Sequence, residues 1–317
     1  MTDGLVSAFA LDGEGRARPL ERATERGEAG EWVWLHFERD LPETERWLTN
    51  GSHLSEPLVE ALLEEETRPR HAPFDDGALV ILRGVNLNTG AAAHEMISLR
   101  LFVSPTLVVS LRRHPIFAVQ DIREACARGR GPGSAGQLLA DIVEGMTDRI
   151  AREVEGMEDA LDDLEERAIG AEPERVRADI LSLRRRALPM KRFLAPQREA
   201  LHALARAPFD FLDEGARTLI AEEADRTVRL VEALDALRER AGLLQEEVTG
   251  IVADRMNRNT YTLSIVAAIF LPLGFLTGLL GINVGGMPGT ENPYAFWMTV
   301  AACVALAVVS AWAVRWL

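Results

Sequence analysis

The sequence predicts an α+β membrane protein with an N-terminal α/β cytoplasmic domain, a long helical stalk and two C-terminal transmembrane helices. Three observations predict this class. Runs rich in Val, Ile, Leu, Phe and Trp, typical of strands, lie before His114. Beyond it, apolar residues recur at helical spacing. Two uncharged runs, 260–280 and 294–314, each reach the roughly 20 residues that a membrane-crossing helix needs.

The first domain, 1–114, alternates strand runs with helix signals. The strand runs are VSAFAL, EWVWLHF, ALVILRGVNL and MISLRLFVSPTLVVS, the last divided at Pro105, whose missing N–H favours a turn. Between the second and third runs, Pro42 is placed to open one helix and Ser55 to cap another. These signals predict an α/β domain that ends near Arg113.

The region 115–212 is predicted to hold long helices. We expect one over 116–128, a second over 137–168 and a third over 174–205. A Gly-rich link, GRGPGSAG, separates the first two. Pro173 fits the first turn of the third, where a missing N–H costs nothing.

The second of these helices carries a strongly acidic face. Its candidate cation-sensing residues are Glu155, Asp159, Asp162, Asp163 and Glu166. One explanation is a solvated helix face, which is the common role of such charge runs. The other is a cation-sensing surface, which requires carboxylates of neighbouring chains to converge on hard cations.

A stalk helix is predicted to lead into the membrane. Asp213 is placed to cap it, and its apolar residues follow a three-four spacing: Leu234, Leu237, Ala241, Leu244, Val248 and Ile251. That narrow seam is typical of a helix packed against parallel copies or neighbours. The alternative is two ordinary helices joined near Gly242 or Gly250. The expected divisions are a stalk at 213–259, a first span at 260–281, an external loop at 282–293 and a second span at 294–315.

Charge sets the expected location and partners. Arg255 and Arg258 precede the first span, Arg315 ends the second, and the segment 282–293 has no basic residue. By the positive-inside rule, both termini face the cytoplasm and the chain sits in the inner (plasma) membrane among its lipids. The net charge of −14 argues against a nucleic-acid partner, because phosphate binding needs a basic surface.

Small and polar residues recur along one face of the first span: Asn257, Tyr261, Ser264, Ala267, Gly274 and Gly278. Such a face suits a path lined by protein, but small residues equally let membrane helices pack closely. Asn283, just beyond the span, offers a neutral acceptor to the water shell of a cation and binds it weakly enough for release. Its alternative role is a C-cap, where Asn tolerates the left-handed conformation.

The stretch 257–288 resembles the pore helix and signature loop of the CorA metal ion transporter family. The family signature is Gly-Met-Asn followed a few residues later by Met-Pro; this chain has Gly281, Ile282 and Asn283, and then Met287 and Pro288. With Ile282 in place of methionine, the chain is more similar to the ZntB-like zinc transporter branch than to the magnesium transporters. The resemblance covers most of the chain, because the order of domains matches the family layout.

This resemblance implies a funnel-shaped homopentamer whose first spans surround a central pore. It implies an outer ring of Asn283 that meets the hydrated cation, a cytoplasmic ring of Asn257 and a hydrophobic constriction at Leu271. The implied pore-lining set is Asn257, Ser264, Ala267, Leu271, Gly274, Gly278 and Asn283. Glu291, at the external mouth, either concentrates cations there or is simply solvated.

The resulting expectation is transport of a divalent metal cation, Zn²⁺ first, with Mg²⁺, Co²⁺ and Ni²⁺ as other candidates and no bound cofactor. A CorA-type Mg²⁺/Co²⁺ ion channel is the alternative within this class. A non-transporting membrane-anchored metal sensor or scaffold is the alternative outside it. An enzyme is not expected, because the chain lacks a phosphate-binding glycine loop, HExxH and GxSxG motifs, and its six histidines are scattered.

Overall fold

The computed structural model describes residues 4–25, 27–92, 94–169, 173–282, 289 and 292–316, which form two compact units, Met1–Gln245 and Glu246–Leu317. The first unit begins with a seven-stranded sheet in the order β2-β1-β3-β7-β6-β5-β4. Its strands are β1 (Leu5–Leu11), β2 (Ala17–Pro19), β3 (Trp32–Glu38), β4 (Arg70–Phe74), β5 (Gly77–Gly84), β6 (Ile97–Val103) and β7 (Leu107–Arg112). The four strand runs expected from the sequence are confirmed, whereas the short strands β2 and β4 were not predicted.

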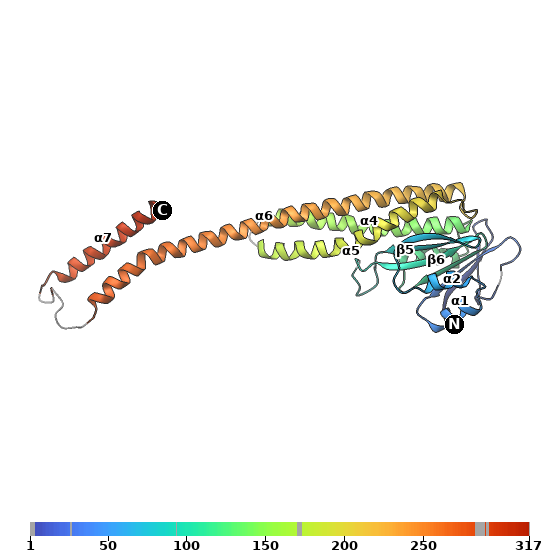
Figure 1. Ribbon diagram of the computed structural model, residues 1–317, viewed down its shortest axis with the longest axis horizontal. Helices are drawn as coiled ribbons and strands as arrows, with labels where there is room; N and C mark the ends of the chain where they lie inside the picture. Colours follow the sequence, from blue (N-terminus) through green and yellow to red (C-terminus); the bar gives the residue numbers. More distant parts are fainter. Residues whose placement is uncertain are drawn as a thin grey trace. The chain divides into compact units, whose positions relative to one another are not determined.

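Helices cover both faces of the sheet (Figure 1). One face packs against α1 (Pro42–Asn50) and α2 (Glu56–Leu63), and the core between them includes Phe37, Leu48 and Leu58. The other face packs against α3 (Phe117–Ala127) and the start of α4 (Ala135–Ala168), around Trp34, Leu99 and Leu139. Strands alternate their side chains between these two cores, as a sheet buried on both faces requires.

The strands β3 and β7 form the only parallel pair among the described strands, and a buried polar group joins them. The Trp34 Nε1–H donates to Ser110 Oγ over 2.8 Å, and Ser110 Oγ donates to the Leu35 carbonyl over 3.3 Å. His36 Nδ1, 2.8 Å from the same hydroxyl, therefore donates to it, which leaves the buried Nε2 without a partner. Burial, with Arg112 and Arg123 nearby, holds the pKa of His36 well below its usual range.

Three long helices pack against one another by side-chain contacts: α4, α5 (Pro173–Arg206) and α6 (Glu214–Leu280). Asp213 caps α6 as predicted, because its Oδ1 accepts from Ala216 N over 2.7 Å, and Ser134 Oγ, which was not predicted, caps α4 by accepting from Gln137 N over 3.0 Å. The predicted cap at Ser55 is wrong in part, because this residue precedes α2 but its side chain makes no capping hydrogen bond. Within the first unit, α6 buries the predicted apolar stripe, including Leu234, Leu237 and Leu244. It continues through Gly242 and Gly250, so the alternative of two joined helices is wrong.

One arginine holds the connection between α5 and α6. Arg217, in the first turn of α6, donates to the carbonyls of Leu212 (3.0 Å), Phe209 (2.8 Å), Ala205 (3.3 Å) and Ala207. Carbonyls at a helix end lack helical donors, so Arg217 supplies donors to the carbonyls of Ala205 and Leu212. It adds a second donor to the carbonyls of Ala207 and Phe209, which also accept from the backbone amides of Phe209 and Leu212.

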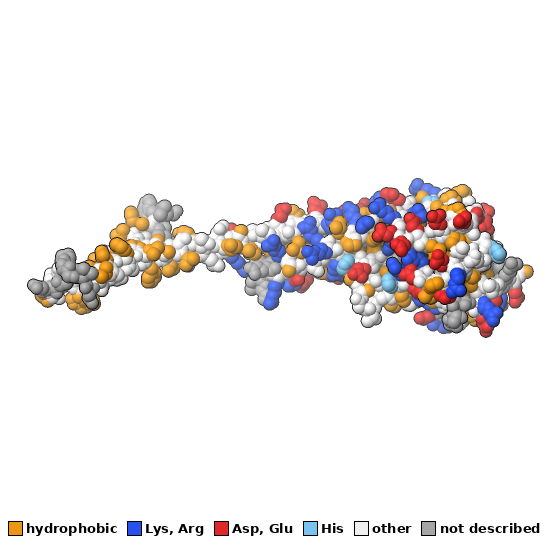
Figure 2. Space-filling view, turned by 60° about the horizontal axis from the view of Figure 1, so that its bottom comes forward, with side chains coloured by type: hydrophobic (Ala, Val, Ile, Leu, Met, Phe, Trp, Pro, Cys, Tyr) orange, Lys and Arg blue, Asp and Glu red, His pale blue; other side chains and the backbone are white. Residues whose placement is uncertain are grey.

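The second unit contains the C-terminal part of α6 and helix α7 (Ala295–Trp316). The structure has two helices long and apolar enough to cross a membrane, α6 and α7, and their most apolar stretches are not buried within the chain. Figure 2 shows apolar side chains gathered over these spans, while acidic and basic side chains crowd the first unit. The expected pair of C-terminal membrane helices is confirmed by length and composition.

Candidate functional site

The described residues of the predicted pore face lie on one side of α6. Asn257, Ser264, Leu271, Gly274 and Gly278 are exposed in the single chain. Ala267 is half-buried on the same side. At 3.6 residues per turn these positions fall within an arc of about 100°. The helix therefore presents one continuous, uncharged strip of small and polar side chains.

Ser264 is one hydrogen-bond acceptor on this strip. Ser264 Oγ donates to the Thr260 carbonyl over 2.8 Å, so its proton is used by the helix and its lone pairs point outward as acceptors. A Cβ added to Gly274 or Gly278 would meet nothing within 4 Å in the single chain. The strip thus offers oxygen acceptors and open space.

Pro272 adds a further acceptor that the sequence analysis missed. It lies inside α6 and has no N–H, so the Ala268 carbonyl loses the donor it would have four residues on. In a membrane span, such a carbonyl is retained where it meets water, a ligand or a neighbouring helix. The sequence could have predicted this free carbonyl, because Pro272 lies one helical turn after Ala268 within the apolar run.

The signature loop falls mostly outside the described residues. Helix α6 ends at Leu280, and the Gly281 amide donates to the Thr277 carbonyl over 2.9 Å, closing the last turn. Ile282 is the last described residue before the loop and is exposed. Asn283 and Glu291 lie outside the described part, so their assigned roles at the outer end and mouth stay predictions.

The acidic face of α4 is partly neutralised by arginines. Asp162 accepts from Arg240 over 2.6 Å, and Asp163 accepts from Arg167 over 3.3 Å. The remaining members of the predicted cation-sensing set are exposed: Glu155, Asp159 and Glu166. Within the described residues, no group of three or more His, Cys, Asp or Glu side chains is placed to hold a metal ion. A sensing surface would therefore need carboxylates from other chains, and it stays a prediction.

Two further carboxylates, unnoticed in the sequence, are shielded from solvent: Glu223 is buried and Asp141 of α4 is half-buried. Glu223 of α6 is 6 % exposed, and its Oε2 has no hydrogen-bond partner. Arg226 bridges it to Asp148 of α4. Burial raises the pKa of Glu223, while Arg226 opposes that rise. Burial, together with nearby Glu144, raises the pKa of Asp141 to about 6.

Replacement of Asp141 by asparagine should change how stability depends on pH. The folded pKa of Asp141, about 6, lies above the unfolded value of about 4, so the folded protein binds the proton more tightly. Its contribution to stability is thus present below pH 4 and is lost as pH rises through 6. We expect Asp141→Asn to raise the unfolding midpoint much more at pH 7.5 than at pH 4.5.

Thermal unfolding of the full chain in detergent at both pH values measures this effect. Asp76→Asn, which removes an exposed carboxylate in the turn after β4, is the matched control and should change neither midpoint. An equal shift at both pH values would show that Asp141 acts through packing rather than through its charge.

Comparisons with known proteins cover nearly the whole chain. Residues 29–315 match the family model described as CorA-like Mg²⁺ transporter protein. The divalent cation transporter CmaX of Pseudomonas aeruginosa is 39% identical over 99% of this chain and 97% of that protein. The zinc transport protein ZntB of Pectobacterium carotovorum is 33% identical over 98% of this chain and 94% of that protein.

Solved structures show the same fold over the full length. The structure of full-length CmaX has a TM-score of 0.85 and 38% identity, covering 99% of this chain and 98% of that one. The CorA magnesium transporter of Methanocaldococcus jannaschii has a TM-score of 0.79 over 98% of both chains, at 21% identity. The N-terminal α/β domain, the long helix and the two C-terminal spans therefore occur together in known proteins.

Proposed function

This chain belongs to the family of CorA-like Mg²⁺ transporter proteins. We propose that it moves divalent cations across the membrane along the exposed face of α6, with Zn²⁺ as the main substrate. The family consists of transporters, which agrees with the expectation that the chain is not an enzyme. The observation that carries the proposal is the uncharged strip from Asn257 to Gly278, which the single chain leaves uncovered in a span.

A path along this strip needs several copies of the chain. One helix cannot enclose a pore, and exposed backbone and polar groups in a membrane must be covered by protein or water. We infer a homopentamer in which five α6 helices surround the path and the α7 helices lie outside them. Both termini then face the cytoplasm, with Asn283 and Glu291 on the outer side, as the arginine distribution predicts.

The cation is expected to travel largely hydrated. No Asp, Glu or His lies between Arg258 and Glu291, so the path offers neither carboxylate nor imidazole to replace the water shell of Zn²⁺. Neutral oxygen acceptors hold a hydrated ion weakly and allow release. Asn283 would select the hydrated ion, and Leu271 would form the narrow apolar ring. A membrane that is negative inside would favour entry by about 4.6 kcal/mol per 100 mV for a divalent ion.

Two observations favour zinc over the other divalent cations as the substrate. The relatives named zinc transport protein are about one-third identical over nearly the full length, and one of them is 33% identical over 310 residues. Ile282 stands where the magnesium transporters are expected to carry methionine. Co²⁺ and Ni²⁺ have the same charge, so the path would also admit them in hydrated form. Magnesium carried by a CorA-type channel remains the competing assignment within the class.

Zinc entry into proteoliposomes that hold a Zn²⁺-sensitive dye tests the function. The wild-type chain should give uptake above empty liposomes, and Asn283→Ala should reduce the rate by about tenfold, because a lost acceptor at the mouth weakens selection of the hydrated ion. Asn292→Ala, in the same outer segment, is the control. Unchanged uptake by Asn283→Ala would overturn the role of Asn283 while leaving transport intact.

The same liposomes separate the competing functions. A rate of Mg²⁺ entry above that of Zn²⁺ would assign the chain to the magnesium channels. Acceleration of Zn²⁺ entry by an inward proton gradient would show proton coupling. Absence of any cation flux would instead favour a membrane-anchored sensor or scaffold, and full activity of a chimera with an inert membrane anchor would confirm it.

A further inference from the structure

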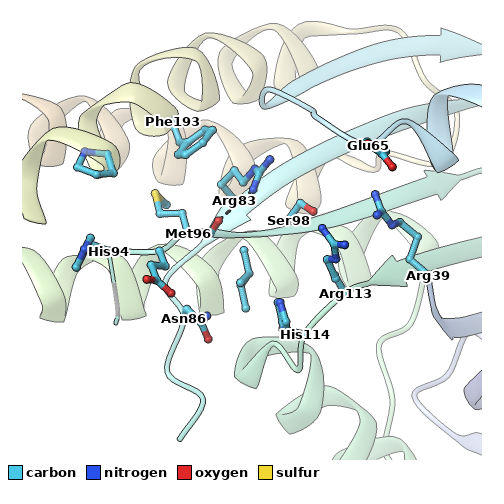
Figure 3. A pocket seen from close by; sticks show the side chains of 13 residues that line it. Arg39, Glu65, Arg83, Asn86, His94, Met96, Ser98, Arg113, His114 and Phe193 are labelled. Carbon is cyan, nitrogen blue, oxygen red and sulfur yellow. Dashed lines mark hydrogen bonds between the residues drawn. The ribbon is translucent and has the colours of Figure 1, made fainter. Parts of the chain in front are cut away.

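A basic pocket opens at one end of the sheet in the first unit (Figure 3). Its volume is about 390 Å³, within the range of small-molecule sites. Strand ends of the sheet supply Arg39, Arg83, Ser98 and Arg113, and helix α5 supplies Phe193. None of these residues belongs to the proposed cation path.

The sheet topology explains why these arginines meet. Strands β3, β5 and β7 end at the same edge of the sheet, where β6 begins. Arg39 follows β3, Arg113 follows β7 and Arg83 lies near the end of β5, opposite Ser98 of β6. Residues two apart on a strand share a face, so the arginines project on the side that α1 and α2 cover.

Arg83 is held in place without a carboxylate. Its Nη1 donates to the Met96 carbonyl over 3.0 Å, and its Nη2 donates to the Thr67 carbonyl over 2.8 Å. Its guanidinium carbon lies 4.6 Å from the centre of the Phe193 ring. The Nε–H is buried and has no hydrogen-bond partner. Among the described residues, no acidic side chain forms an ion pair with it.

A second guanidinium near the pocket is also buried and also forms no ion pair with an acidic side chain among the described residues. Arg100 of β6 is 1 % exposed and donates only to the carbonyls of Leu62 (2.7 Å) and Glu65 (3.2 Å). Its Nε–H is also unpartnered. Burial, together with the positive charges of Arg39 and Arg83, lowers the pKa of Arg100 to about 10, although Glu64 and Asp40 oppose the shift. Like charges gathered in a low-dielectric region are costly unless an anion offsets them.

The nearby carboxylates offset this positive charge only in part. Glu66 acts on Arg83 and Glu64 acts on Arg100, but both acids are exposed, and Glu64 forms an ion pair with Arg70. Asp40 is shared between Arg39 and Arg113, at 2.7 Å and 2.5 Å, so one negative charge serves two guanidiniums. Glu65 and Glu95 also line the pocket, but both residues are exposed. His94 and His114 line it as well.

We propose that this pocket binds a phosphate-bearing small molecule, whose phosphate lies against Arg83, Arg39 and Arg113 and whose organic part lies against Phe193. Guanidinium groups present forked donors that match phosphate oxygens, and they bind phosphate more specifically than a single ammonium charge does. Phosphate alone would fill only part of the cavity. The apolar ring beside Arg83 therefore favours a phosphate ester over the free ion.

Ser98 offers a test that keeps every arginine. Ser98 pairs with Arg83 across β5 and β6, so Ser98→Glu places a carboxylate opposite the guanidinium as a built-in competitor. Ser98→Gln is the matched control of the same length without charge. Calorimetry on the full chain in detergent should show saturable binding of adenosine 5′-monophosphate, and Ser98→Glu should weaken it about tenfold relative to Ser98→Gln, by loss of one charged contact.

Three results would overturn the proposal. The first is that the wild-type chain shows no saturable binding of adenosine 5′-monophosphate or inorganic phosphate. The second is that Ser98→Glu and Ser98→Gln bind the monophosphate with equal affinity. The third is that the wild-type chain binds adenosine as tightly as its monophosphate. Arg113→Gln provides a second test, because loss of this exposed arginine should weaken binding without loss of the fold. Arg128→Gln, at the residue that follows α3, should leave binding unchanged. Binding is the readout, so the outcome does not depend on which cation the chain transports.

Discussion

Zinc flux should fall about tenfold or more when Gly278 is replaced by phenylalanine, because a ring projecting from each copy would obstruct a narrow pore. Gly278 lies on the uncharged strip of α6, and its missing side chain faces open space in the single chain. In the proposed pentamer the same residue from five chains faces the path. Dye-loaded proteoliposomes measure the rate directly.

The matched control is Leu280→Phe. Leu280 lies two residues further along α6, about 200° around the helix, and is also exposed. It receives the same ring on the opposite side, where lipid or a neighbouring helix would accept it. Reduced flux in both variants would point to damaged packing, and wild-type flux in Gly278→Phe would show that this face does not line the path.

Replacement of Arg217 by methionine should destabilise the first unit by about 3 kcal/mol, since hydrogen bonds to charged groups contribute roughly 1.5–3 kcal/mol each and several are lost together. Methionine keeps most of the length of the side chain but none of its donors. The carbonyls of Ala205 and Leu212 would then need water, and those of Ala207 and Phe209 would keep only a backbone donor. The α5–α6 connection would fray first.

Hydrogen exchange of the full chain in detergent localises this effect. Amides near 205–216 should exchange faster in Arg217→Met than in the wild type, while the sheet strands stay protected. Arg229→Met, an exposed arginine on the same helix, is the control and should leave exchange unchanged. Uniform acceleration across the sheet and helices would show that Arg217 supports the whole unit rather than its local connection.

The sequence predicted the long elements because each carries a strong period. The α4 stripe through Ile142, Met146 and Ile150 and the strand run 32–38 identify helix and strand without tertiary information. The strands β2 and β4 were missed, since they are short and contain proline and polar residues. Edge strands of this kind form because a neighbour offers backbone partners, and no local pattern records that.

The candidate site also has a part that the sequence could predict and a part that it could not. The uncharged strip of α6 follows from residue spacing, and its role as the lining of a path stays a prediction. The role of Asn283 depends on copies of the chain, which a single sequence does not contain. The pocket was missed entirely, because Arg83 and Arg100 are residue types usually found on the surface. Only the meeting of strand ends far apart in sequence brings them together.

The parallel pairing of β3 with β7 also constrains how the domain is made. Val33 pairs with Leu107, so the ends of a long loop must meet before this central pair can form. Strands β4 to β7 form an antiparallel meander from neighbouring segments and can pair early, whereas β1 to β3 have no central partner until β7 has left the ribosome. The hairpin made first during synthesis is thus completed last, and the edge of β3 stays unpaired until β7 is available.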